Sequence, residues 1–259
     1  MTFTLPPRPS KPRETGITSI IDFGPDTFGW TGPRGVKDLL DCAADHIDYA
    51  KIYALNSLLM PADTLREIVA LYRDAGVLPY AGGIYLEYAL QEDEVDEALA
   101  HLKTLGLDRM ELSENYVELT DEQRTRLLDK LQGAGFEVIY EFGRKNPEEP
   151  LPIDELEEIV LGMLDRDIHH IIFEQSEFDA MEAANPKAVD DLRQRNWFKQ
   201  LLIEGDPYRF PKQHADLIQR FGPEVNLANI PPGHALRIAQ FRYGIGRAVN
   251  YSIIHARSI

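Results

Sequence analysis

Cysteine is almost absent from this chain, with Cys42 alone in 259 residues. A disulfide within the chain is therefore excluded, and we expect a reducing, cytoplasmic setting. No apolar run approaches the roughly 18 residues of a membrane helix. The proline-rich stretch Met1 to Pro12 lacks the apolar centre of a signal peptide. The sequence thus predicts a soluble protein without a membrane partner. Cys42 falls in an amphipathic pattern, where we expect a packed thiol rather than a nucleophile.

Basic residues are also scarce, since 27 lysines and arginines face 43 acidic residues, for a net charge of -16. Such a balance argues against nucleic acid and anionic membranes as partners. It also disfavours a bare, highly anionic substrate, unless a metal ion or local cations receive it. High solubility or a halophilic origin would explain the same charge.

Several well-known site motifs are missing. We find no Walker loop, no GxGxxG after the first apolar run and no GxSxG elbow. The chain has no cysteine cluster and no histidine pair at zinc-ligand spacing. His169 and His170 open a predicted strand at the end away from the expected site, and we interpret them as structural.

Eight short apolar runs recur along the chain at intervals of 25 to 32 residues. This is the length of one βα unit, and eight units in a chain of about 250 residues are typical of a (β/α)8 TIM barrel. The runs begin near Ile17, Ile47, Leu78, Arg109, Glu137, His169, Gln200 and Val225. We expect residues 1–16 to form an extended arm and residues 17–259 a single catalytic barrel domain. An open, doubly wound sheet is the structural alternative.

Helical patterns separate the apolar runs. Several end at glycine, as at Gly76, Gly106 and Gly135, and Thr120 begins a capping-box pattern. The predicted helices are Val36–His46, Ala62–Ala75, Glu92–Leu105, Asp121–Ala134, Ile153–Leu164, Pro186–Phe198, Pro211–Phe221 and His234–Val249.

Acidic residues stand at the ends of five predicted strands. In a barrel these ends converge on one mouth, where such folds place their chemistry. Oxygen ligands gathered there suit Mg²⁺. The five acids are Asp22, Glu111, Glu141, Glu174 and Glu204, and Glu87 follows the third strand.

Lysines accompany these acids. Lys51 lies between Tyr49 and Tyr53 on one face of the second strand, so we expect it to point inward. Burial among carboxylates could tune it for acid–base catalysis, and a purely structural ion pair is the alternative. Gly82 and Gly83 could bring backbone N–H groups to an anion, or could simply form a tight turn.

Read together, these segments resemble the phosphosulfolactate synthase family of coenzyme M biosynthesis, from about residue 11 to 247. The matching segments include Asp48-Tyr49-Ala50-Lys51, Gly82-Gly83 with Glu87, Glu111 with Ser113, Glu141-Phe142-Gly143-Arg144-Lys145, Glu174, Glu204 and Val225-Asn226-Leu227-Ala228-Asn229-Ile230. The resemblance implies a (β/α)8 barrel and a Mg²⁺-dependent addition of sulfite to phosphoenolpyruvate. It makes Lys145 the candidate general acid, with Lys51, Glu141 and Glu111 as further catalytic candidates. The implied metal ligands are Asp22, Glu111, Glu141 and Glu174.

The chain departs from the family pattern in its loops. Ser176 replaces an arginine, which removes a phosphate clamp. Leu55, Ile84 and Phe178 add apolar groups where the family has other residues. Arg144, Arg209 and Lys212 could still supply cations. The predicted substrate-binding residues are Tyr49, Tyr53, Asn56, Gly82, Gly83, Ser113, Arg144, Ser176, Phe178, Asn226 and Asn229.

We therefore expect a lyase-type enzyme for a bulkier, less charged small molecule. Conjugate (Michael-type) addition, dehydration or cyclisation next to a carbonyl, in specialised metabolism, would reuse the same proton chemistry. Phosphosulfolactate synthase activity itself is the first alternative, and a non-catalytic, stress-associated barrel is the second. Metal binding and association into a homo-oligomer are left open.

Overall fold

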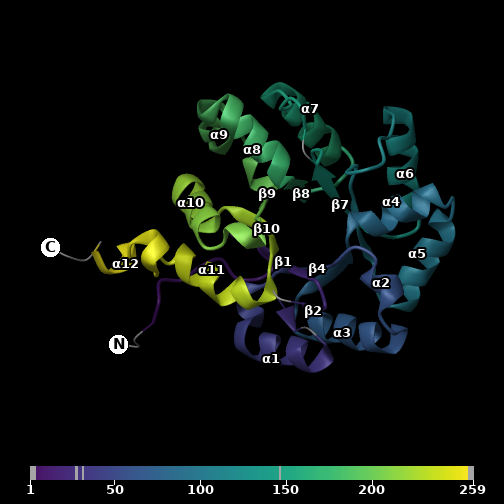
Figure 1. Ribbon diagram of the computed structural model, residues 1–259, viewed down its shortest axis with the longest axis horizontal. Coiled ribbons are helices and arrows are strands. Elements are labelled where there is room, and N and C mark those ends of the chain that lie inside the picture. The colour runs from purple at the N-terminus through teal and green to yellow at the C-terminus, as the bar shows by residue number, and fades with distance from the viewer. Residues whose placement is uncertain (1–3, 27–28, 31, 146, 256–259) are drawn as a thin grey trace.

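Eight parallel strands close into a barrel in the computed structural model, which describes residues 4–26, 29–30, 32–145 and 147–255 (Figure 1). The closed order, β1-β10-β9-β8-β7-β6-β5-β4, follows the chain except that the short hairpin β2–β3 lies outside it. The barrel strands are β1 (Thr18–Asp22), β4 (Tyr49–Ile52), β5 (Leu78–Ala81), β6 (Arg109–Leu112), β7 (Glu137–Phe142), β8 (Ile171–Phe173), β9 (Leu201–Glu204) and β10 (Asn226–Ile230). The hairpin pairs β2 (Pro25–Asp26) with β3 (Gly29–Trp30). The predicted (β/α)8 barrel is confirmed.

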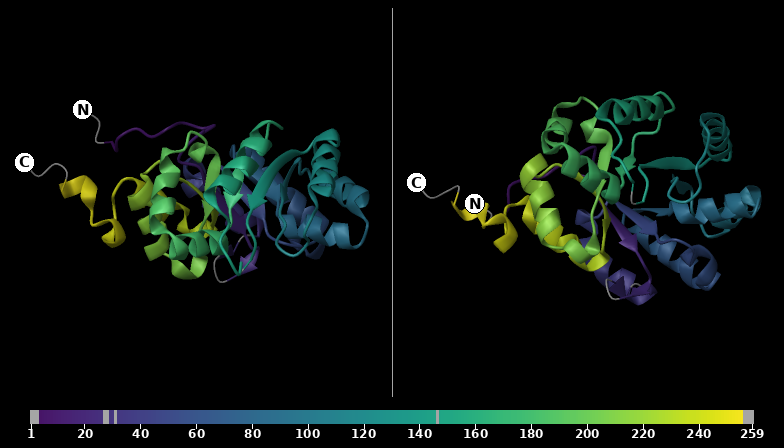
Figure 2. Two further views of the ribbon diagram at one scale, coloured as in Figure 1. Left: turned by 90° about the horizontal axis from the view of Figure 1, so that it is seen from above. Right: turned by 45° about the horizontal axis from the view of Figure 1, so that its top comes forward.

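Helices surround the strands on the outside, as two further views show (Figure 2). The α-helices are α1 (Pro33–Ala43), α2 (Asn56–Leu59), α3 (Ala62–Asp74), α4 (Gly83–Gln91), α5 (Val95–Thr104), α6 (Asp121–Gly133), α7 (Ile153–Leu164), α8 (Gln175–Ala184), α9 (Pro186–Asp191), α10 (Lys212–Phe221), α11 (Ala235–Arg242) and α12 (Ser252–His255). Short 3₁₀ turns, among them η4 (Pro207–Arg209) and η5 (Pro232–His234), complete the connections. Thr120 begins α6 with the predicted capping box, in which Gln123 returns the hydrogen bond.

All eight barrel strands begin within two residues of their predicted starts. The helices were predicted less completely, because α2, α4 and α8 follow their strands almost directly. Gly83 and Gln175 lie in the first turns of α4 and α8, outside the predicted helices. Helices α4 and α8 matter for function because their first turns face the end of the barrel where the strands finish.

The core has two layers, which follow from the two-residue period of the strands. Ile139 and Glu141 of β7 point into the barrel, whereas Val138 and Tyr140 pack outward against the helices. The inner apolar layer comprises Ile17, Tyr49, Tyr80, Ile139, Ile172, Leu202 and Ala228. It fills the barrel below the mouth, so polar side chains further along the same strands lie on an apolar floor.

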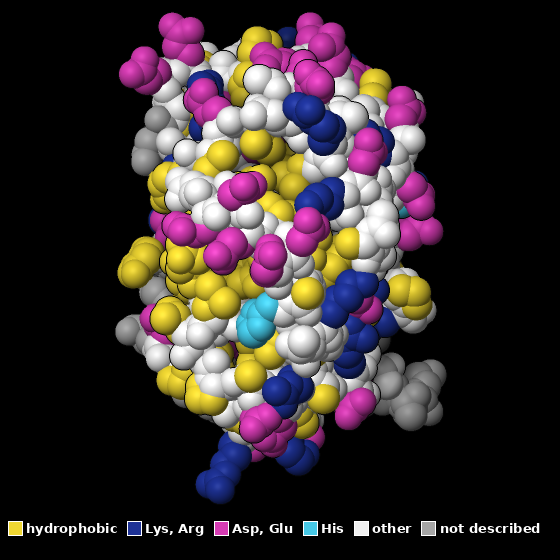
Figure 3. Space-filling model, turned by 90° about the vertical axis from the view of Figure 1, so that its right-hand side faces the viewer, with side chains coloured by type: hydrophobic (Ala, Val, Ile, Leu, Met, Phe, Trp, Pro, Cys, Tyr) yellow, Lys and Arg dark blue, Asp and Glu magenta, His cyan; other side chains and the backbone are white. Residues whose placement is uncertain are grey.

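The surface reflects the composition. On the face shown in Figure 3, acidic side chains are spread widely, with basic ones among them and apolar patches between. Cys42 is exposed on α1, so the expectation of a packed thiol is wrong. In the described part of the chain no helix is long and apolar enough to cross a membrane.

Candidate active site

A cavity of about 360 Å³ opens at the carboxyl ends of the barrel strands. Enzymes with this fold place their chemistry at that face. The lining combines two lysines and four acids with small and apolar side chains. Its residues are Ile21, Phe23, Lys51, Tyr53, Ala54, Gly82, Gly83, Ile84, Glu111, Asn115, Tyr116, Glu141, Lys145, Gln175, Glu204, Gly205, Asp206, Pro207 and Asn229.

Lys51 forms the centre of the cavity floor. Its Nζ lies 2.8 Å from Oε2 of Glu111 and 3.1 Å from Oε2 of Glu141, and all three side chains are buried. Nζ also donates to Oδ1 of Asn229, at 3.3 Å. The remaining oxygen of Glu111 accepts the backbone N–H of Gly83 at 2.8 Å. The ion pair that we considered for Lys51 is therefore present, and it joins three strands across the barrel.

Glu111 and Glu141 share the ammonium of Lys51, and their pKa values shift in opposite directions. Burial raises the pKa of Glu111 to about 8, aided by the charge of Glu141, although Lys51 acts in the opposite direction. Burial would also raise the pKa of Glu141, but Lys51, Lys145 and a hydrogen bond from Asn115 lower it. Near neutral pH the pair therefore consists of one carboxyl and one carboxylate. Two carboxyl groups with separated pKa values are the usual arrangement for acid–base work.

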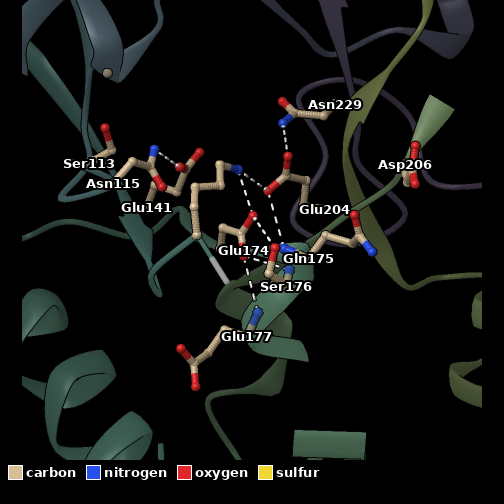
Figure 4. A network of polar contacts seen from close by, with 12 residues as sticks. Ser113, Asn115, Glu141, Glu174, Gln175, Ser176, Glu177, Glu204, Asp206 and Asn229 are labelled. Carbon is tan, nitrogen blue, oxygen red and sulfur yellow. Dashed lines mark hydrogen bonds and ion pairs between the residues drawn. The ribbon is translucent and has the colours of Figure 1, made fainter. Parts of the chain in front are cut away.

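Lys145 lies on the rim of the same cavity, in the loop after β7. Its Nζ is 2.6 Å from Oε1 of Glu174 and 3.6 Å from Oε2 of Glu204, and Figure 4 shows the two carboxylates side by side. The turn that brings the lysine there requires glycine: Gly143 has φ of 111°, and a Cβ on it would lie 3.0 Å from Cβ of Glu174. Lys145 is 32% exposed, which leaves it accessible from the cavity.

The acids around Lys145 determine its charge. Burial alone would lower the pKa of this ammonium, but Glu204, Glu141 and Glu174 together raise it above the ordinary value. Lys145 is therefore protonated at neutral pH. Because it carries a proton, Lys145 can act as a proton donor, and its side chain is more exposed than that of Lys51, the other lysine of the cavity.

The first turn of α8 is already occupied by the chain's own carboxylates. Oε2 of Glu174 accepts the N–H groups of Ser176 (2.5 Å) and Glu177 (3.1 Å), and Oε2 of Glu204 accepts that of Gln175 at 3.3 Å (Figure 4). A helix N-terminus is a ready anion-binding site. Here its donors hold internal anions, and Lys145 is bound to the same pair.

Glu87 organises the loop after β6. This buried carboxylate accepts hydrogen bonds from the Ser113 hydroxyl (2.5 Å) and from the backbone N–H groups of Asn115 (3.1 Å), Tyr116 (2.7 Å) and Val117 (3.0 Å). The loop in turn presents Asn115 to Glu141, with 2.7 Å between Nδ2 and Oε1. Glu87 thus shapes one wall of the cavity without lining it.

The structure gathers about half of the predicted site residues. Those that line the cavity are Lys51, Tyr53, Gly82, Gly83, Glu111, Glu141, Lys145 and Asn229. Four others lie nearby but do not line it: Asn56 donates to the Phe23 carbonyl, Ser113 is buried under Gly83, Ser176 bonds to Glu174, and Arg144 is exposed. Their assignment to substrate binding stays a prediction.

Three predicted substrate-binding residues lie elsewhere. Tyr49 is at the opposite end of the barrel, where its hydroxyl bonds to His170, because it sits two residues before Lys51 on the same inward face. Asn226 opens β10 at that end too and bonds to the Ile17 N–H and the Lys199 carbonyl. Phe178 is buried in the core against Phe173 and Phe221, since the α8 turn directs it inward. For these three the prediction is wrong.

The four predicted metal ligands do not all meet at one point. Asp22 turns outward and accepts hydrogen bonds from Tyr72 (2.7 Å) and the Gly24 N–H (2.8 Å), because Ile21 holds the inward position of β1. One oxygen of each of Glu111, Glu141 and Glu174 is bound to a lysine. Among the described residues no group of three or more potential ligands is arranged to hold a metal ion. The donor set in this arrangement does not fit the predicted Mg²⁺ site.

Among the cavity residues that the sequence analysis did not single out are two with amide side chains, Asn115 and Gln175. Both follow strand ends by one to three residues, in segments that read as connections. The signal that could have found Asn115 was the acid Glu87, which is buried on α4, because a buried carboxylate needs hydrogen-bond donors such as the backbone N–H groups of a neighbouring loop.

A family model described as (2R)-phospho-3-sulfolactate synthase (ComA) matches residues 6–247. The chain belongs to the phosphosulfolactate synthase family. Its relatives include phosphosulfolactate synthases from Methanothermobacter thermautotrophicus (31% identical, covering 94% of each chain) and from Methanocaldococcus jannaschii (27% identical, covering 90% of this chain and 92% of the relative). A third, from Bacillus subtilis, is 27% identical over 93% of this chain and 94% of its own. The predicted family resemblance is confirmed.

Among solved structures the chain is similar to dihydrodipicolinate synthase from Agrobacterium tumefaciens, with a TM-score of 0.52 and 14% identity over 94% of this chain and 78% of that one. The enzyme of the same name from Oceanobacillus iheyensis gives a TM-score of 0.50 and 10% identity, over 89% and 74% of the two chains. At this identity the likeness concerns the barrel fold alone.

Proposed function

We propose that this family member is a lyase-type enzyme that adds a nucleophile to, or eliminates one from, a carbon–carbon double bond next to a carbonyl. Its substrate is bulkier and less charged than phosphoenolpyruvate. The observation that carries this proposal is the occupied α8 turn: Lys145 and three backbone N–H groups hold Glu174 and Glu204 instead of presenting themselves to a phosphate. Conjugate addition, dehydration and cyclisation all use the same two proton transfers.

The charge of the lining supports a less anionic substrate. Two lysines face four acids, Glu111, Glu141, Glu204 and Asp206, and no arginine of the described chain lines the cavity. Lys51 is fully engaged with two of these acids. A substrate with a phosphate and a carboxylate would enter a site whose acids repel it, and sulfite would add more negative charge.

Each proton transfer has a residue suited to it. In the addition direction the nucleophile loses a proton to Glu141, the ionised member of the buried pair, as it bonds to the distal alkene carbon. The electron pair moves to the carbonyl as an enolate, and Lys145 then protonates the carbon next to the carbonyl. Elimination reverses both transfers. Lys51 remains a cation, because Glu111 and Glu141 raise its pKa despite burial, and it keeps Glu141 ionised.

The proposal is tested by incubating the protein with phosphoenolpyruvate, sulfite and Mg²⁺ and following ³¹P NMR. We expect no turnover above that of Lys145→Ala. Efficient formation of phosphosulfolactate, lost in Lys145→Ala, would instead establish the family's own reaction, which sequence identity of 31% favours. The stress-associated, non-catalytic alternative predicts that Lys145→Ala and Glu141→Gln leave the biological activity unchanged.

Magnesium remains a prediction of the family resemblance. The proposed proton transfers use no metal, because oxygens of Glu111, Glu141 and Glu204 are already bound to lysine or amide groups. Dialysis against EDTA followed by Mg²⁺ titration, read by the melting temperature, tests it separately from catalysis. A saturable rise of the melting temperature would show that Mg²⁺ binds.

A further inference from the structure

The lining of the cavity is divided between two sides of the barrel. In the closed strand order, β1, β4 and β5 are neighbours, and so are β6 to β10. The ends of β1, β4 and β5 contribute Ile21, Phe23, Tyr53, Ala54, Gly82, Gly83 and Ile84. The one charged residue from this side, Lys51, directs its ammonium across the barrel to Glu111 and Glu141. This half of the lining is therefore apolar in what it presents to the cavity.

The ends of β6 to β10 contribute nearly all of the polar groups. These are Glu111, Asn115, Glu141, Lys145, Gln175, Glu204, Asp206 and Asn229. Several of them are tied to one another by hydrogen bonds and ion pairs, as between Asn115 and Glu141 or Asn229 and Glu204. The proton-transfer groups of the proposed reaction all lie on this side.

The apolar side ends in an aromatic wall. The rings of Phe23 and Tyr53 lie 4.8 Å apart between centroids, tilted by 57°, and Tyr53 remains 43% exposed. Tyr116, in the loop after β6, also lines the cavity and is 72% exposed. Aromatic side chains that remain exposed in the lining of a cavity are anchors for apolar or aromatic ligand groups.

We infer that the substrate has two parts: a carbonyl head that lies against β6–β9 and an uncharged apolar or aromatic group that packs on Phe23, Tyr53 and Ile84. This inference rests on the proposed function and adds to it the side on which the apolar group binds. The 360 Å³ of the cavity lies at the lower end of the range for sites that enclose a drug-sized ligand. A head alone would leave the aromatic wall in contact with water.

Two neutral probes of the full-length protein test the inference, trans-cinnamamide and crotonamide. They share an unsaturated amide head, and a phenyl ring in the first replaces a methyl group in the second. Binding is followed by protein-observed NMR titration. We expect cinnamamide to bind about tenfold more tightly, which corresponds to about 1.4 kcal/mol. Equal affinity, or no detectable binding of either probe, would overturn the inference.

Single substitutions locate the ring. Tyr53→Ala is expected to weaken cinnamamide about fivefold and leave crotonamide within about twofold, because it removes ring contact alone. Tyr88→Ala is the matched control, since Tyr88 is similarly exposed, at 42%, but does not line the cavity. If both variants changed cinnamamide binding alike, the ring would not bind on Tyr53.

The two-part substrate and the proposed reaction can be refuted independently of each other. Turnover of phosphoenolpyruvate and sulfite would refute the proposed reaction even if cinnamamide bound to Tyr53. Conversely, failure of the probes to distinguish phenyl from methyl would refute the two-part substrate while leaving the roles of Lys145 and Glu141 intact.

Discussion

The side-chain amide of Asn115 donates a hydrogen bond of 2.7 Å to Oε1 of Glu141. An ionised carboxylate can only accept, so this contact fixes which end of the amide faces Glu141. It also helps to lower the pKa of Glu141, the base of the proposed reaction. The loop that carries Asn115 is held by Glu87, which therefore acts on the base from a distance.

The first prediction concerns Glu87 as a positioning residue. Asn115→Ala should raise the pKa of Glu141 because a hydrogen bond to its charged form is lost. Glu87→Gln should raise it in the same direction, since the NH₂ end of the new amide cannot accept, so that at least one of the backbone N–H groups of the loop loses its acceptor. The measurement is carboxyl ¹³C NMR across a pH titration, with Glu141→Gln to identify the resonance.

The double variant sharpens this test. If Glu87 acts through Asn115, the two pKa changes should not add. Additive changes, or an unchanged Glu141 pKa in folded Glu87→Gln, would show that Glu87 only stabilises the loop.

A second prediction concerns the shared ammonium. Lys51→Met leaves the carboxylate of Glu141, beside the carboxyl of Glu111, buried without its cation, and removing one partner of a buried pair costs about 3–5 kcal/mol. We expect a loss of that size in the free energy of unfolding, measured with urea at pH 7. Adding Glu111→Gln and Glu141→Gln to Lys51→Met should restore most of it. A triple variant as unstable as Lys51→Met would contradict the charge explanation.

The third prediction is a pH dependence. Glu111 has its pKa raised from 4.5 to about 8 by burial, so between these values the folded state keeps a proton that the unfolded state releases. Stability therefore falls as pH rises through this window, by up to about 1.4 kcal/mol per pH unit from this group. Glu111→Gln resembles the protonated form and should remove that part of the slope.

Urea unfolding at several values between pH 5.5 and 8.5 provides the comparison. We expect Glu111→Gln to gain stability relative to the unmodified protein as pH rises. The difference is informative because other groups titrate alike in both proteins. A constant difference across the range would show that Glu111 is ionised throughout.

The fourth prediction concerns a tight contact behind the cavity. A Cβ on Gly205 would lie 2.5 Å from Nε2 of His214, whose ring is fully buried. Gly205→Ala should therefore destabilise the fold by about 1–3 kcal/mol through overpacking. Combined with His214→Ala, the alanine should cost less than alone, as measured by chemical denaturation.

Gly162→Ala is the matched control. Gly162 lies in α7, and no atom lies within 4 Å of the Cβ position. Alanine there should stabilise the helix by about 0.5–1 kcal/mol. If Gly205→Ala left the free energy of unfolding unchanged or raised it, the space next to His214 would be larger than the structure shows.

Much of the architecture was readable from the sequence, and Lys51 shows why. Alternation along β4 placed it inward between Tyr49 and Tyr53, and the interval between apolar runs predicted its neighbours. Both inferences use local periods that the backbone imposes. They do not say how far along the barrel axis each inward residue lies. That is why Tyr49 was predicted in the site but bonds to His170 at the opposite end.

The second limit of sequence-based prediction was the direction in which side chains point at the strand ends. Asp22 and Glu111 look alike in sequence, each at the last or next-to-last position of a strand. In the structure Asp22 turns out toward Tyr72, whereas Glu111 turns in toward Lys51. One residue of register decides the face, because successive side chains alternate. For this reason Asp22 lies apart from the other predicted metal ligands.

By itself, the sequence determined the barrel, the family and the inward position of Lys51, because these depend on periodic patterns and on spacing. Only the tertiary structure decided which charges meet. Lys145 bonds to Glu174, 29 residues away, and Lys51 to Glu141, 90 residues away. Such partners are set by barrel closure and by turns such as that at Gly143. The pKa values of the site follow from those contacts, and so they cannot be read from the order of the residues.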